Sequence, residues 1–80
     1  MQLIEFVVRG EFITLDRLLK ATGLAASGGL AKAMVADGRV QVDGRDELRK
    51  ACKLRAGQVV SLTGVRISLR AEATPGASDV

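Results

Sequence analysis

The residues best suited to chemistry in this 80-residue chain are the cations of its middle part. Residues 16–70 contain 11 Lys or Arg side chains against five Asp or Glu side chains, a net charge of +6. The two ends together carry −3, from one Arg and four acids. Ammonium and guanidinium groups bind phosphate, and the planar fork of Arg does so in a bidentate manner. A basic middle between acidic ends therefore favours a polyanionic partner.

Six of these cations lie in a predicted helix, around a hairpin and in the charged loop after it. They are predicted to converge on one face, with the helix lying beside that loop. Fixed cations beside a helix end suit the phosphates and 2′-hydroxyls of A-form RNA. The start of that helix adds backbone N–H groups that can face a phosphate. A solvated loop face is the alternative for the Arg49–Lys50 pair. The candidate RNA-binding residues are Lys32, Arg39, Arg45, Arg49, Lys50, Lys53, Ser27 and Gly28.

Residue types that the sequence lacks argue against catalysis. There is no His, Trp or Tyr, which removes His-based triads, His general bases and His metal sites. The single cysteine, Cys52, cannot form an internal disulfide, fits a reducing cytosol, and is expected to be a small buried apolar residue. Only Phe6 and Phe12 are aromatic, so we do not expect a stacking platform for single-stranded nucleic acid. The prediction is a non-enzymatic chain without metal or cofactor.

The first elements are a strand and a short helix. Residues 2–8 alternate, are rich in β-forming residues and carry apolar groups on both faces, which predicts a strand that is covered on one side. Thr14 is a suitable N-cap for a helix that ends at Gly23. Leu15, Leu18 and Leu19 form its apolar stripe.

A second helix is predicted between Ser27, as its N-cap, and Gly38. Leu30, Met34 and Val35 are expected to form its inward stripe. Two glycines in its first turn each cost up to about 1 kcal/mol relative to Ala. They indicate either close packing or the close approach of a ligand to that backbone.

The sequence after Gly38 predicts a small sheet. Asp43-Gly44 is typical of a type I′ hairpin turn, and residues 59–62 and 65–69 have the character of strands. Residues 71–80 are predicted to be a disordered tail. Together these elements predict an α+β fold, with two short packed helices against a small antiparallel sheet, in a single domain spanning residues 1–70.

The order of these elements resembles the S4 RNA-binding domain, from Thr14 to Leu62. The matching segments are Leu15-Asp16-Arg17-Leu18-Leu19, Ala26-Ser27-Gly28, Ala31 to Gly38, Arg39-Val40-Gln41-Val42-Asp43-Gly44, Glu47-Leu48-Arg49-Lys50 and Ala56-Gly57-Gln58-Val59-Val60. The short stand-alone bacterial S4-like proteins are the most similar. Two positions depart from the family: Gly28 replaces the usual Arg, and Gln58 replaces the usual Asp.

The resemblance implies the αL motif, a pair of helices packed on a small bent sheet, and the binding of structured RNA, either ribosomal or transfer RNA. We expect a monomeric cytoplasmic protein that associates with the ribosome, with no signal peptide and no membrane span. The alternative is a protein-interaction adaptor that docks on a larger complex through the apolar strand at residues 3–8.

Overall fold

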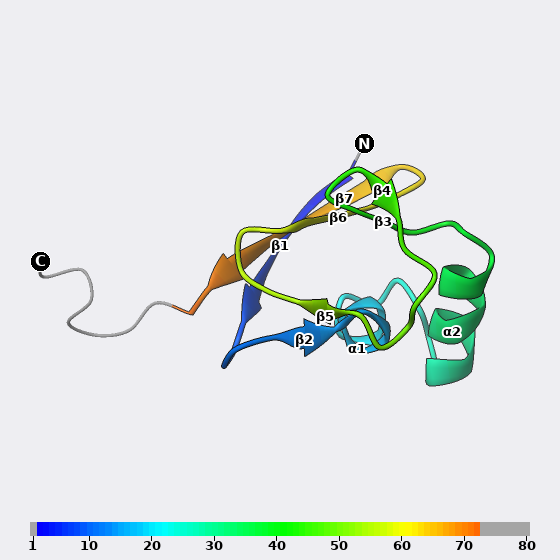
Figure 1. Ribbon diagram of the computed structural model, residues 1–80, viewed down its shortest axis with the longest axis horizontal. Coiled ribbons are helices and arrows are strands. Elements are labelled where there is room, and N and C mark those ends of the chain that lie inside the picture. The colour runs from blue at the N-terminus through cyan, green and yellow to red at the C-terminus, as the bar shows by residue number, and fades with distance from the viewer. Residues whose placement is uncertain (1, 73–80) are drawn as a thin grey trace, which may run out of the picture.

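The computed structural model describes residues 2–72, which form two helices and seven strands (Figure 1). The helices are α1 (Leu15–Ala21) and α2 (Gly28–Ala36). The strands are β1 (Gln2–Val8), β2 (Ile13–Thr14), β3 (Gln41–Val42), β4 (Arg45–Asp46), β5 (Lys53–Leu54), β6 (Val59–Leu62) and β7 (Val65–Ala71). The predicted α+β fold with two short helices is confirmed.

The main sheet is mixed. Its five strands have the order β1-β7-β6-β3-β4, and β2 pairs with β5 in a separate antiparallel ribbon. β1 and β7 run parallel, with Gln2 opposite Val65 and Val8 opposite Ala71, whereas an entirely antiparallel sheet was expected. A parallel pair needs a long crossover connection, and both helices together with the intervening strands supply it here.

Helix α1 forms as its sequence predicts. Thr14 is the N-cap with an extended backbone, although its side chain makes no capping hydrogen bond. Leu15, Leu18 and Leu19 are fully buried. Gly23 follows the C-cap with a φ of 78°, a left-handed conformation that glycine adopts without strain.

Helix α2 buries a different face from the one predicted. Its buried residues are Ala31 and Val35, whereas Leu30 is 52% exposed, so the prediction of Leu30 as a core residue is wrong. Helix α2 packs against α1. Ala31 and Val35 lie four positions apart on the buried face of α2, and their small or β-branched side chains allow the two helices to approach closely. The Ser27 hydroxyl caps the helix and accepts a hydrogen bond from the Leu30 N–H at 3.2 Å.

The two glycines of the first turn of α2 are not packing glycines. A methyl group added at Gly28 would meet no atom within 4 Å, and one added at Gly29 would meet only the Ser27 hydroxyl at 3.8 Å. The backbone at the start of α2 is therefore open to solvent.

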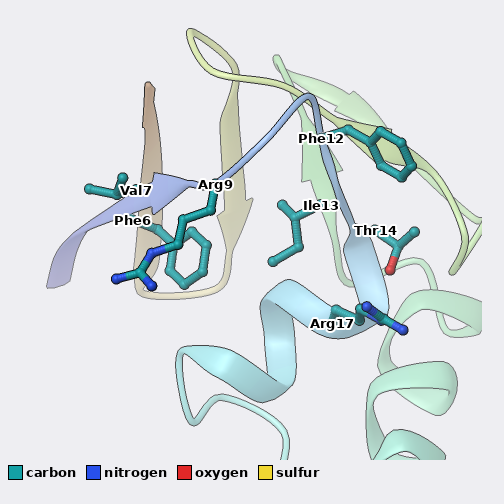
Figure 2. Close-up of a pocket in the computed structure, with 7 residues that line it drawn as sticks. All are labelled: Phe6, Val7, Arg9, Phe12, Ile13, Thr14 and Arg17. Carbon is teal, nitrogen blue, oxygen red and sulfur yellow. The ribbon is translucent and has the colours of Figure 1, made fainter. Parts of the chain in front are cut away.

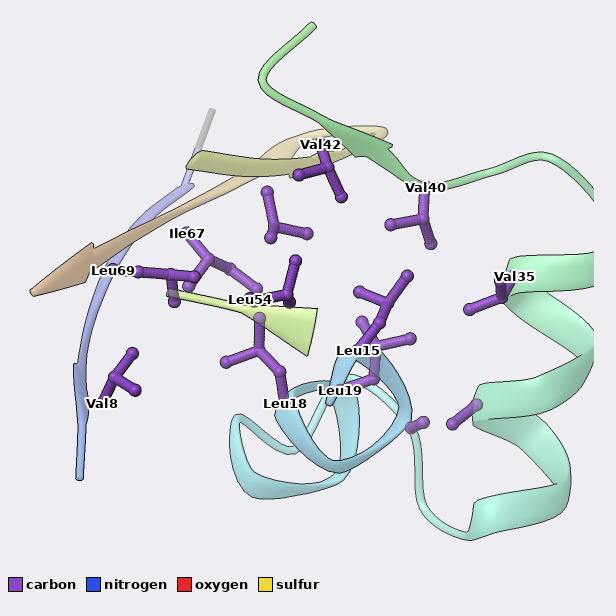
Figure 3. Packing of buried hydrophobic residues seen from close by; sticks show 13 residues of the cluster. Val8, Leu15, Leu18, Leu19, Val35, Val40, Val42, Leu54, Ile67 and Leu69 are labelled. Atoms are coloured by element: carbon purple, nitrogen blue, oxygen red, sulfur yellow. The ribbon is translucent and has the colours of Figure 1, made fainter. Parts of the chain in front are cut away.

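The hydrophobic core lies between the main sheet and α1, with α2 closing one end (Figure 3). Ile67 and Leu69 from β7 and Val8 from β1 lie across from Leu18 of α1, and Leu54 of β5 is buried between them. This arrangement places β5 and the loop before it directly beside α1.

The β3–β4 turn has the predicted type I′ character. Asp43 and Gly44 have φ values of 52° and 83°. The Asp43 carboxylate accepts hydrogen bonds from the Val59 N–H at 2.9 Å and from the Gln58 side-chain amide at 3.1 Å. The Gln58 side chain also accepts from the Arg55 N–H at 2.7 Å, which gives this departure from the family pattern a structural role in the turn.

The last strand, β7, extends to Ala71, one residue into the segment predicted as a tail. Glu72 is exposed and lies outside any strand, and residues 73–80 of the predicted tail lie outside the described residues. Neither helix within residues 2–72 has the length and apolar character needed to cross a membrane.

Candidate nucleic-acid interface

Four of the predicted cations surround one hollow between α2 and the loop that leads into β5. Lys32 comes from α2, whereas Arg49, Lys50 and Lys53 come from the loop and β5. We call this hollow, of about 730 Å³, the basic hollow. All four side chains are exposed to solvent. The segments at 32 and 49–53 are thus brought to one surface, as predicted.

The loop around the basic hollow is held by the main chain. The N–H groups of Leu15 and Asp16, in the first turn of α1, donate to the carbonyl oxygens of Cys52 and Lys50, both at 3.0 Å. These donors have no partner inside the helix, so the loop satisfies them. Lys53 is held in addition by the pairing of β5 with β2, in which it lies opposite Thr14. The side chains of the loop cations take no part in this anchoring.

Arg49 contributes less net charge than the lysines because it pairs with Glu47. The Glu47 carboxylate accepts from the Arg49 Nε at 3.1 Å and from the Arg49 backbone N–H at 3.0 Å. The side-chain bond, followed by the backbone bond, lowers the pKa of Glu47 to about 2. The Arg49 side chain remains 80% exposed. Within residues 2–72, Lys32, Lys50 and Lys53 make no ion pair, so they carry the positive charge of the hollow.

Arg39 and Arg45 do not join the other cations, and the prediction that all six converge is wrong for these two. Arg39 lies 3.7 Å from the Asp37 carboxylate and lines a different hollow, beside Gln41. Arg45 lies on β4, at the edge of the main sheet. The β3–β4 hairpin belongs to that sheet, whereas the chain after β4 turns away towards α1 (Figure 1).

The start of α2 lies about one helical turn before Lys32, which lines the basic hollow. Gly28, Lys32 and Ala36 are spaced four residues apart, which places them on one face of the helix, and the last two line the hollow. The Ser27 hydroxyl is already engaged in capping. Gly28 is not among the residues that line the hollow, and its backbone is open to solvent.

Cys52 lies on the apolar side of the basic hollow. It is half-buried against the core, and burial, followed by the hydrogen bond with Glu47, raises the pKa of its thiol. A raised thiol pKa leaves the neutral, weakly nucleophilic form at neutral pH. This agrees with the expectation of a packing residue, although the side chain is only partly buried.

A second hollow was not predicted from the sequence. It has a volume of about 810 Å³ and lies between β1, β2 and the start of α1 (Figure 2). It contains both aromatic side chains of the protein, and we call it the aromatic hollow. Its lining residues are Phe6, Val7, Arg9, Phe12, Ile13, Thr14 and Arg17. Phe6 and Phe12 belong to different segments, so only the fold shows that both line this hollow.

The two hollows adjoin each other. The Lys53 ammonium of the basic hollow lies 4.9 Å from the ring centroid of Phe12 in the aromatic hollow. This distance is within the range of a cation–π interaction. Lys53 is also the register partner of Thr14, which lines the aromatic hollow.

Comparison with known proteins identifies the family. The pattern of the S4 domain matches residues 6–70, which is most of the chain. The chain belongs to the S4 domain family. It is also 50% identical over 52 residues to YbcJ of Escherichia coli (strain K12), an alignment that covers 65% of this chain and 74% of the relative. YbcJ of Shigella flexneri matches with the same identity and coverage.

The solution structure of YbcJ from E. coli has the same fold as this S4 domain. It superposes with a TM-score of 0.63 and 38% sequence identity, covering 88% of this chain and 87% of that one. That structure is described as revealing an αL motif involved in RNA binding. The fold expected from the resemblance is thereby confirmed, and RNA binding is a property ascribed to a relative with the same architecture.

Proposed function

We propose that this S4 domain binds structured RNA, ribosomal or transfer RNA, through the basic hollow, and that it does so without catalysing a reaction. The observation that carries the proposal is the meeting of Lys32, Arg49, Lys50 and Lys53 around one hollow. These residues come from two separate parts of the chain, and solubility alone does not require them to lie together.

The form of the basic hollow suits the backbone of folded RNA. Its three lysines make no ion pair within residues 2–72, and the exposed Arg49 guanidinium keeps N–H groups that Glu47 does not use. The loop backbone is held by α1, so binding orders side chains rather than the main chain. Double-stranded RNA is recognised largely by shape and by phosphate and 2′-hydroxyl contacts, which such a surface supplies.

Gly28, on the same face of α2 as Lys32, supplies backbone N–H groups to the proposed interface. Arg39 and Arg45 lie outside the basic hollow, so in this proposal they contribute to the general positive field and make no direct contact. We further propose that the protein acts as a cytoplasmic monomer that associates with the ribosome, which accords with an S4 domain of this size.

The test is a fluorescence titration of a labelled hairpin RNA at several salt concentrations, with ribosomal and transfer RNA fragments compared. If the four cations of the basic hollow each neutralise a phosphate, the logarithm of affinity should fall against the logarithm of salt concentration with a slope of about −3 to −4. A response that is independent of salt, or no binding at low salt, would contradict the proposal.

The adaptor alternative has one observation in its favour. Leu3 and Val7 on β1 are exposed, and Leu3 is 73% accessible. The family and the description of the YbcJ structure both point to RNA instead. Co-purification of a protein that survives nuclease and high salt would reverse this preference.

A further inference from the structure

We infer that the aromatic hollow holds an unpaired nucleotide of the RNA bound at the basic hollow. This inference rests on the proposed function and extends it. It assigns the domain a junction between a duplex and a single strand as its ligand, with the duplex on the basic hollow and the single-stranded nucleotide beside Phe12.

Phe12 has the exposure that base stacking needs. Its side chain is 38% exposed, and it is absent from both the buried core and the set of partly buried residues packed against that core. An aromatic ring with no role in the core and with access to solvent is available to a ligand on the face that Lys53 does not cover. Nucleobases stack on such rings with little dependence on sequence, because every base has a π face.

The polar groups of the aromatic hollow suit a nucleotide better than an apolar peptide. Arg9 and Arg17 line it, both are exposed, and neither makes an ion pair among the residues that the structure describes. No acidic residue is among those lining the hollow. Figure 2 shows Arg9 beside Phe6 at one end and Arg17 beside Thr14 at the other, with Ile13 between them. A ligand in this place meets apolar surface flanked by phosphate-binding groups.

The position of the aromatic hollow relative to the basic hollow supports a continuous RNA path. Lys53 lines the basic hollow, and its ammonium lies 4.9 Å from the Phe12 ring centroid. Thr14, opposite Lys53 in the β2–β5 pair, lines the aromatic hollow. A strand that leaves a duplex at the basic hollow can therefore pass Lys53 and reach Phe12 directly.

The experiment compares two hairpin RNAs that differ only in a short single-stranded tail, which carries 2-aminopurine as a fluorescent base. The chain contains no Trp or Tyr, so the emission of the probe is measured without protein background. The full-length protein should bind the tailed hairpin about five- to tenfold more tightly than the blunt one, and 2-aminopurine emission should change on binding. Phe12→Leu keeps an apolar side chain and removes the ring, so it should abolish the emission change and most of the tail effect. Blunt-hairpin affinity should fall by no more than about twofold, because Lys53 loses only its contact with the ring.

Two further variants separate the possible outcomes. Leu3→Ala removes an exposed apolar side chain from β1 outside the hollow and should keep the full tail effect. The double variant Arg9→Gln/Arg17→Gln should reduce the tail effect without touching the aromatic rings. Equal binding of tailed and blunt hairpins by the unmodified protein, or an undiminished tail effect in Phe12→Leu, would overturn the inference while leaving the proposed function intact. Failure of both RNAs to bind would overturn the proposed function and this inference together.

Discussion

The backbone N–H of Asp16 donates to the carbonyl oxygen of Lys50 at 3.0 Å, so the first turn of α1 holds the loop that carries the cations of the basic hollow. The bond uses only the main chain of Lys50. The position of the loop and the charge on its surface are therefore separable, and substitutions of the side chains alone can test the charge.

Replacing Lys50 and Lys53 together by Ala should weaken hairpin RNA binding about tenfold at low salt and make the salt slope shallower by about 1.5 to 2. Both side chains are exposed, so the free energy of unfolding should change by less than about 1 kcal/mol. Fluorescence titration and urea denaturation measure the two quantities. Arg66→Ala, which removes one exposed cation from β7 outside both hollows, is the control and should change the slope little. Loss of folding in the double variant would show that these lysines are structural.

Acidification should reduce the stability of the domain through Glu47. Its pKa in the folded protein is about 2 against an ordinary value of 4.5, because the Arg49 side chain and backbone N–H bind its ionised form. A lowered pKa contributes stability that is fully present above pH 4.5 and is lost as the pH falls towards 2. Urea denaturation at neutral pH, at pH 4.5 and near pH 2 measures this. Glu47→Gln cannot ionise, so its stability should decline less over the same interval; a decline as steep as that of the unmodified protein would assign the effect to other acids.

Asp43 should stabilise the hairpin through both its backbone and its carboxylate. Its φ of 52° is unfavourable for most side chains, and its carboxylate accepts from the Val59 N–H and the Gln58 amide. Asp43→Ala should lower the free energy of unfolding by about 2 kcal/mol, since it loses these hydrogen bonds and keeps the strained backbone. Asp43→Asn tolerates the left-handed conformation and retains an acceptor, so we expect a loss of less than about 1 kcal/mol. Equal losses in chemical denaturation would argue against a special role for this turn.

Gly28 offers a test of the proposed contact at the start of α2. An arginine there, the residue usual in the S4 family, would lie on the face of α2 that carries Lys32 and would meet open space. Gly28→Arg should raise hairpin RNA affinity several-fold, with a steeper salt slope. Gly28→Ala should stabilise the helix by up to about 1 kcal/mol without altering affinity. If the arginine leaves affinity unchanged in the same titration, RNA does not approach this end of α2.

Several features of this protein followed from its sequence because they depend on neighbouring residues. The spacing of Leu15, Leu18 and Leu19 requires one buried helical face, and those residues are buried. Asp43-Gly44 requires a turn with two positive φ angles, which the structure has. The order of these local signals also indicated the S4 family and the α+β fold.

Other features required the tertiary structure, because they depend on contacts between distant segments. β1 pairs in parallel with β7, and no local pattern in either strand specifies that partner. The buried face of α2 is chosen by its contact with α1, which is why Ala31 is inside and Leu30 outside. Phe6 and Phe12 line the same hollow because the fold places β1 and β2 beside the start of α1.

The same reason separates the cations. Arg39, Arg45, Lys50 and Lys53 lie close together in the sequence. After β4, however, the chain leaves the main sheet and pairs with β2 through β5. Arg45 stays with the main sheet on β4, and Arg39 lies between α2 and β3, where it pairs with Asp37. The loop lysines follow α1. The sequence determined that the middle of this protein is basic, and long-range backbone pairing decided which of those charges share a surface.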